Sequence, residues 1–238
     1  MSRAGSGGTE DQNDRVYADT PTLRAAAANY LHKGLDGCYI HSMRWPLGEE
    51  ERDFIRELGD RDALLNNDRR IVLPRRSPDA AAMGYVTGVL PAQLIADPSV
   101  VEEIPLYIAG STKATRIRGM AGWEWAELPS TATMHLMLSF RNIVAADSIV
   151  LTLNGESLDQ ESREYMPRNG NRGKFDTSGS YDGLRVVVPL NSSRVRGALK
   201  HGANTLGVSL AARPNGLMGG ISLEEVEVTI CNSNAPKL

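Results

Sequence analysis

The sequence predicts an α+β protein in which a mainly antiparallel β-sandwich follows a short α/β segment. From about residue 77 onward, apolar and polar residues alternate in six separate runs, as expected of strands with one buried face. Before residue 77, helical patterns instead flank one short, continuously apolar run, which is the order of elements in α/β structures. We therefore expect a flexible arm (residues 1–20), an α/β segment (21–76) and a β-sandwich domain (77–238).

The arm is rich in Gly, Ser, Asp and Asn and contains no apolar run. Such a segment buries too little surface to offset the entropy lost on ordering. The stretch from Gly5 to Gly8 lacks the preceding strand that a glycine-rich phosphate loop requires, so phosphate binding is not predicted.

The α/β segment opens with Thr20-Pro21, which predicts a helix with Thr20 as its N-cap and an end at Gly34. The predicted inward face of this helix consists of Leu23, Ala26, Ala27, Tyr30 and Leu31. The next run, from Asp36 to Met43, predicts a strand buried on both faces. Two more helices, Glu49–Leu58 and 62–68, and a brief extended piece at 71–74 complete the segment. Because a parallel strand needs neighbours on both edges, something outside this segment must complete its sheet.

The sandwich is predicted from six alternating runs that can share one core. Their inward residues are Ile104, Leu106 and Ile108; Met134, Leu136, Leu138 and Phe140; Ile149, Leu151 and Leu153; Leu184, Val186, Val188 and Leu190; Leu206, Val208 and Leu210; and Val226, Val228 and Ile230. Asn154-Gly155 predicts a turn directly after one strand, and the polar, glycine-rich stretch from Asp159 to Asp182 predicts a long loop.

Composition excludes several classes of protein. The net charge of −3, with basic residues interspersed among acidic ones, disfavours nucleic-acid binding. No apolar stretch approaches the roughly 20 residues of a membrane span, and the first twenty residues lack the apolar core of a secretory signal. Cys38 and Cys231 lie far apart without histidines at metal-ligand spacing. We expect a soluble chain of unassigned location, with no membrane partner, disulfide framework, metal or cofactor.

Several stretches resemble bacterial glycoside-hydrolase-like proteins. The helix and predicted strand from Leu23 to His41, with Gly34-Leu35-Asp36-Gly37 between them, resemble the last helix–strand step of a (β/α)8 (TIM) barrel. The stretches 55–60 and 64–74 resemble the closing helix and exit of such barrels. Leu151 to Glu156 and Leu199 to Leu206, with their Leu-Asn-Gly and Gly-x-Asn motifs, are similar to the β-domain that follows them.

The resemblance implies a carbohydrate-associated protein, but the segment before the sandwich supplies only about two of the eight units of a barrel. No motif for a glycosidase acid or nucleophile is present, so no catalytic residue is assigned. We expect a C-terminal portion of a glycoside-hydrolase-like protein that is inactive by itself, with the missing barrel strands lying upstream or coming from a partner chain. The alternative is a self-standing carbohydrate- or protein-binding β-sandwich module.

The candidate substrate-binding residues are His41, Arg44 and Trp45, at or just past the end of the predicted strand, where barrel enzymes build their sites. Trp can stack on the apolar face of a sugar while His and Arg bond its hydroxyl groups. In the competing reading, Trp45 caps the barrel rim and Arg44 pairs with one of Glu49, Glu50 or Glu51.

Other chemically suggestive residues are expected to be structural. With only 5% aromatic residues in the chain, the pair Trp123 and Trp125 favours core packing over a sugar platform. Glu225 and Glu227 alternate with valines on the wet face of a strand, so they do not form an acid/base pair. His32, His135 and His201 have no visible nucleophile partner.

Overall fold

The computed structural model describes residues 19–40, 46–76, 88–117, 120–126, 132–168 and 183–232. Its helices are α1 (Thr20–His32), α2 (Glu49–Leu58), α3 (Arg61–Asn66) and α5 (Ser193–Ala198). Its strands are β1 (Arg69–Val72), β2 (Ala92–Leu94), β3 (Glu102–Ile108), β4 (Ser111–Ile117), β5 (Met120–Ala126), β6 (Thr133–Arg141), β7 (Ser148–Leu153), β8 (Glu156–Ser157), β9 (Glu164–Arg168), β10 (Gly183–Pro189), β11 (Gly202–Ala212) and β12 (Ile221–Cys231).

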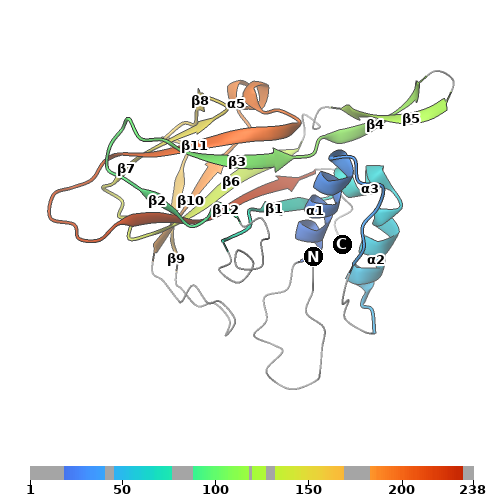
Figure 1. The fold of residues 1–238 in the computed structure, drawn as a ribbon, viewed down its shortest axis with the longest axis horizontal. Helices are drawn as coiled ribbons and strands as arrows, with labels where there is room; N and C mark the ends of the chain where they lie inside the picture. The colour runs from blue at the N-terminus through green and yellow to red at the C-terminus, as the bar shows by residue number, and fades with distance from the viewer. Residues whose placement is uncertain are drawn as a thin grey trace.

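Two antiparallel sheets form the predicted sandwich (Figure 1). The large sheet has the order β1-β12-β6-β10-β9, and β2 also pairs with β12. The small sheet has the order β3-β11-β7-β8. Strands β4 and β5 form a separate hairpin that extends away from the sandwich (Figure 1). The α+β class and the antiparallel sandwich are therefore confirmed.

All six alternating runs are strands, and their inward residues meet in one core drawn from both sheets. Only Leu184 of the predicted set stays partly exposed, at the rim of that core. Many outward residues of the large sheet, such as Met137, Val187 and Thr229, are half-buried, and others form an ion-pair network. Arg185 of β10 lies 3.8 Å from Glu225 and 3.9 Å from Glu227, the two carboxylates predicted to lie on the outer face.

Asn154 and Asn204 belong to the two sandwich motifs on which the resemblance rests, and the structure brings them into contact. Asn154 Nδ2 donates to Asn204 Oδ1 at 2.8 Å, and the Thr205 backbone donates to Asn154 Oδ1 at 2.9 Å. Asn154 and Gly155 have positive φ values of 52° and 84°, which form the predicted turn between β7 and β8. The two motifs thus describe one hydrogen-bonded junction between β7 and the start of β11.

The predicted loop from Asp159 to Asp182 is wrong in part, because β9 lies within it and pairs with β10. Residues 159–163 are held by the buried Arg163, whose guanidinium donates to the carbonyl oxygens of Ile149 and Leu158 at 2.8 and 2.9 Å. Residues 169–182 lie outside the described residues.

The helices of the α/β segment form as predicted, with small shifts at their ends. α2 has the predicted bounds, and α1 ends just before Gly34, whose φ is +93°. The N-cap of α1 is Asp19 and not Thr20, because the Asp19 carboxylate accepts from the backbone of Thr22 at 3.0 Å. An Asp placed before the first turn also compensates the helix dipole, which Thr cannot do.

The predicted buried strand from Asp36 to Met43 does not form in its described part. Residues 36–40 are not in a strand, and Tyr39 is 87% exposed. Within the described residues no strand pairs with this run, so nothing there satisfies its backbone groups in a sheet or covers its side chains.

The strand after α3, in contrast, does form. β1 pairs with β12 along its whole length, from Arg69 opposite Ile230 to Val72 opposite Glu227. The last part of the predicted α/β segment is therefore an edge strand of the sandwich. Pro74 and Leu73, predicted as extended, directly follow it.

Candidate functional site

Helix α1 lies against the edge of the sandwich beside β1 (Figure 1). One side of the helix packs on the sandwich, and the other packs on helices α2 and α3. Ala25 joins the sandwich core, while Leu23, Ala27 and Leu31 pack with Phe54 of α2 and Leu64 of α3. The alanines let the helix backbone approach the sheets closely.

The side chain of Asn29 fastens α1 to the end of β3. Asn29 Nδ2 donates to the Tyr107 carbonyl, and the Ala109 backbone donates to Asn29 Oδ1, both at 2.9 Å. One amide side chain thus satisfies a backbone acceptor and a backbone donor where β3 leaves the sheet. On the opposite side, Arg24 bonds Glu57 of α2 through two nitrogens, at 2.5 and 2.8 Å.

Two hollows border α1, one on each side. The edge groove has a volume of about 530 Å³ and lies between α1, β1, β3 and the start of β11. The helix pocket has a volume of about 260 Å³ and lies between α1, residues 35–40 and Phe54 of α2. Tyr30 lines both hollows.

The helix pocket is apolar and opens beside exposed aromatic residues. Leu35, Tyr39 and Ile40 line it, and Leu35 and Tyr39 are exposed. Tyr30 is 47% exposed, so its predicted place on the inward face of the helix is wrong. Its neighbours Asn29 and His32 both contact Tyr107 of β3, whereas Tyr30 lies between the two hollows and stays partly open to solvent.

The predicted substrate-binding residues His41, Arg44 and Trp45 lie outside the described residues. Ile40, which precedes them, lines the helix pocket, and Pro46 follows them. Tyr30 and Tyr39 are candidate binding residues that the sequence reading did not select. The sequence offered a weak signal for each of them. Tyr30 is an aromatic residue near the C-terminal end of a helix, and Tyr39 lies in an apolar run that no strand of the described chain covers.

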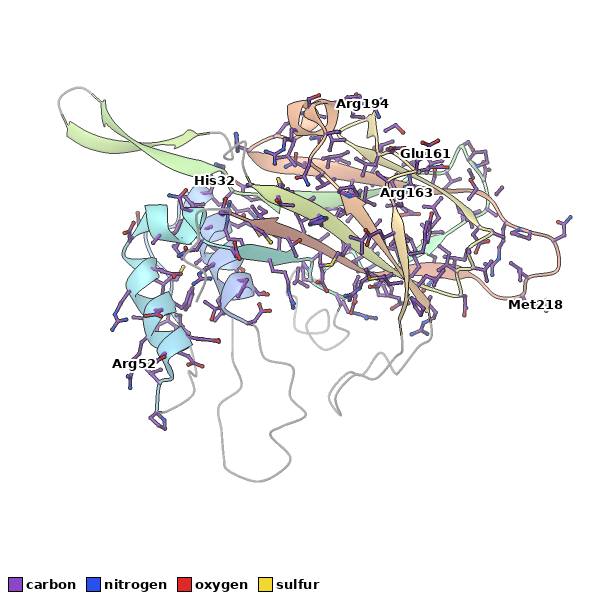
Figure 2. The ribbon with its side chains drawn as sticks, turned by 180° about the vertical axis from the view of Figure 1, so that it is seen from behind. His32, Arg52, Glu161, Arg163, Arg194 and Met218 are labelled. Carbon is purple, nitrogen blue, oxygen red and sulfur yellow. The ribbon has the colours of Figure 1, made fainter. Side chains whose placement is uncertain are left out.

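A polar cluster closes the C-terminal end of α1. His32 Nδ1 lies 2.6 Å from the hydroxyl of Tyr107, and Lys33 Nζ lies 4.4 Å from the centre of the Tyr107 ring. Burial, and then the charge of His201, lower the pKa of His32 below its ordinary value. Figure 2 labels His32 where α1 meets the sandwich.

Glu224 is buried on β12 at the bulge between Leu223 and Glu225. Its carboxylate lies 2.7 Å from Arg75 and 3.4 Å from Arg141, and it accepts from the Ser222 hydroxyl at 2.5 Å. These partners occupy the carboxylate, so Glu224 is a structural ion-pair centre and not one half of an acid/base pair.

The remaining sequence candidates carry no site in the described part of the chain. Trp123 and Trp125 stand opposite Ala114 and Thr112 in the β4–β5 hairpin, and their side chains lie outside what the structure describes. His135 is half-buried on the outer face of β6. Cys38 and Cys231 are exposed free thiols.

The described residues contain no group of three or more His, Cys, Asp or Glu residues placed to hold a metal ion. Within the same residues, no helix is both long enough and apolar enough to cross a bilayer.

Comparisons with known proteins give limited likeness. No family model matches the chain, and no curated protein matches it. Among solved structures, a variant of the glycoside hydrolase BuGH86 in complex with neoagarooctaose is 16% identical, with a TM-score of 0.29. The match covers 69% of this chain and 19% of that one.

The wild-type BuGH86 complex with neoagarooctaose is 18% identical, with a TM-score of 0.30, and the match covers 72% of this chain and 20% of that one. The chain thus spans about a fifth of the length of the glycoside hydrolase structures it matches. TM-scores of this size carry no functional assignment.

Proposed function

We propose that this chain is the C-terminal portion of a glycoside-hydrolase-like protein: a carbohydrate-associated β-sandwich joined to an incomplete α/β segment, without a complete active site of its own. The observation that carries the proposal is the contrast between the two parts. The sandwich has a closed core, whereas the run from Leu35 to Ile40 stays largely exposed beside α1. A run of this composition is expected to be covered by neighbouring strands, which the rest of a barrel would supply.

Sugar binding is proposed at the helix pocket and the residues that follow it. Exposed tyrosines provide flat apolar faces with a polar tip, which suit a sugar ring. Tyr30 and Tyr39 lie at the pocket, and His41, Arg44 and Trp45 directly continue the segment that forms its wall. The trio would add stacking and hydroxyl-bonding groups to this surface.

Calorimetric titration of the full chain with a panel of oligosaccharides, including neoagarooctaose, tests the proposal. Trp45→Ala and Tyr39→Ala are each expected to weaken binding at least fivefold. Tyr165→Ala is the matched control, since Tyr165 is 47% exposed on β9, in a strand far from the pocket along the large sheet. If the two test variants keep wild-type affinity and normal thermal stability, the helix pocket is not the site. Hydrolysis of any saccharide by the chain alone would contradict its assignment as non-catalytic.

The alternative is a self-standing carbohydrate- or protein-binding module. The closed sandwich core favours it, since that core needs no further domain to bury its apolar residues. This alternative predicts saccharide or protein binding that survives Trp45→Ala and Tyr39→Ala together.

A partner chain that supplies the missing strands is a third arrangement. It would cover the exposed residues from Leu35 to Tyr39 and form an obligate complex. Sedimentation of the purified chain as a stable monomer would exclude it.

A further inference from the structure

The edge groove has the size and chemistry of a second ligand site, on the other side of α1 from the helix pocket, with Tyr30 on the wall between them. Its volume of about 530 Å³ falls within the range of small-molecule sites. Its floor is apolar, formed by residues such as Ala25, Ile71 and Leu106, and its rim carries Tyr30, Lys33 and Arg70. A concave apolar floor with a few convergent polar groups is the usual form of a binding site.

The charged side chains that line the groove are positive. Lys33 and Arg70 are the charged residues that line it, and no carboxylate does so among the described residues. Arg70 is already engaged, since its guanidinium lies 3.2 Å from Asp19 and 3.9 Å from Glu227. Lys33 forms no ion pair with a carboxylate in the described part of the chain, so its ammonium group can accept a negative ligand.

The position of Lys33 is fixed by its surroundings. Its ammonium group lies 4.4 Å from the centre of the Tyr107 ring, a cation–π distance. That ring is held in turn by the contact between the Tyr107 hydroxyl and His32 Nδ1 at 2.6 Å. Tyr30 lies three residues before Lys33, the C-cap residue of α1, and is half exposed. The rim therefore presents an aromatic ring and a cation side by side.

We propose that the edge groove binds a short saccharide that carries a carboxylate or sulfate group, with Lys33 contacting the negative group and Tyr30 packing on the sugar ring. The ligand class rests on the proposed carbohydrate function, whereas the site and its charge preference rest on the groove alone. Ala26, which also lines the groove, leaves room for the sugar on the helix side.

Titration of the full chain with three probes tests the inference: trigalacturonate, a sulfated galactotriose and neutral galactotriose. Wild-type protein is expected to bind at least one anionic probe about three- to fivefold more tightly than the neutral one, the effect of one exposed ion pair. The preference is expected to shrink in high salt. Whichever anionic probe binds more tightly identifies the group that Lys33 contacts.

Three variants locate the site. Lys33→Gln is expected to abolish the preference for the anionic probe, and Ala26→Phe, which fills the groove, is expected to remove its binding. Arg194→Gln is the control, because it removes one positive charge from exposed α5, away from α1 (Figure 2). Thermal unfolding of each variant checks that the fold is retained.

The outcomes separate this inference from the proposed function. If neutral and anionic probes bind equally, or if Lys33→Gln leaves the preference intact, the edge-groove assignment is wrong while carbohydrate binding stands. If no trisaccharide of either kind binds, the edge-groove inference fails, and the oligosaccharide panel decides separately whether carbohydrate binding stands.

Discussion

The junction between Asn154 and Asn204 provides a stability prediction that can be worked out contact by contact. The Asn204 side chain is buried, with 4% of the residue exposed. Its oxygen accepts from the backbone of Lys200 and from Asn154 Nδ2, both at 2.8 Å. Its nitrogen donates to the carbonyl oxygens of Lys200 and Gly202, at 2.8 and 3.1 Å.

Asn204→Ala removes all four contacts. Each hydrogen bond contributes about 0.5 to 1.5 kcal/mol net, and water can reach some of the loop groups left behind. We therefore expect the free energy of unfolding to fall by about 2 to 4 kcal/mol, measured by urea denaturation followed by circular dichroism. A loss below about 0.5 kcal/mol would refute the assignment of this side chain as the centre of the junction.

Asn154 allows backbone and side-chain effects to be separated. Its φ of 52° suits Gly and Asn, while its side chain bonds the Ala198 carbonyl at 2.7 Å, Asn204 and the Thr205 backbone. Asn154→Gly loses the hydrogen bonds but keeps the turn, whereas Asn154→Ala also adds about 1 kcal/mol of left-handed strain. Because the two asparagines share a bond, the double Ala variant is expected to cost less than the sum of the single ones. Additive costs would show that they act independently.

Three further predictions concern single positions. Glu224→Gln is expected to lower stability by about 1 to 3 kcal/mol, because Arg75 and Arg141 lose their charge partner while remaining partly hydrated; an unchanged urea midpoint would contradict this. The pKa of His32 is lowered in the folded state, so its contribution to stability should be complete above the unfolded pKa of about 6.5 and should fall as the pH drops below that value. His32→Gln should make the free energy of unfolding less sensitive to acid. An unchanged pH profile of stability in this variant would argue against the prediction. Gly183→Ala would place a Cβ 1.9 Å from the Phe140 carbonyl oxygen and should cost about 2 to 3 kcal/mol. Gly37→Ala is its control, because a Cβ at Gly37 meets nothing within 4 Å, and its stability should be close to that of the wild type. Thermal unfolding of both variants measures the difference.

The long strands were predicted correctly because alternation of apolar and polar residues marks a strand with one buried face. The short strands were predicted only in part: the extended piece at 71–74 overlaps the end of β1, whereas β2 was not predicted. β1 begins with Arg69-Arg70, and β2 has three residues, so neither carries a readable alternation. Both become strands through pairing with β12, more than a hundred residues away, and no local pattern encodes that contact.

The run from Asp36 to Met43 illustrates the opposite error. Its apolar composition is typical of a buried strand, but composition cannot tell whether covering strands are available. In the described part of the chain no strand covers the run, and Leu35 and Tyr39 are exposed.

The candidate site could be predicted only in part. The chemistry of His41, Arg44 and Trp45 was read from residue type and position, and it stays a prediction. The edge groove could not be found from sequence, since Lys33 and Arg70 come to line one groove only when α1 docks beside β1.

The pairing of β1 with β12 has a consequence for the order in which the chain can fold. Strand β12 is the last strand in the described chain and β1 is the first, so their hydrogen bonds close the longest loop in the sheet. During synthesis, α1 and β1 leave the ribosome early, yet β1 has no edge to join until residues 221–231 have followed. Until then the side chains of α1 and β1 that belong to the sandwich core, such as Ala25 and Ile71, lack most of their partners. A chaperone that holds nascent apolar segments would be expected to bind this region first.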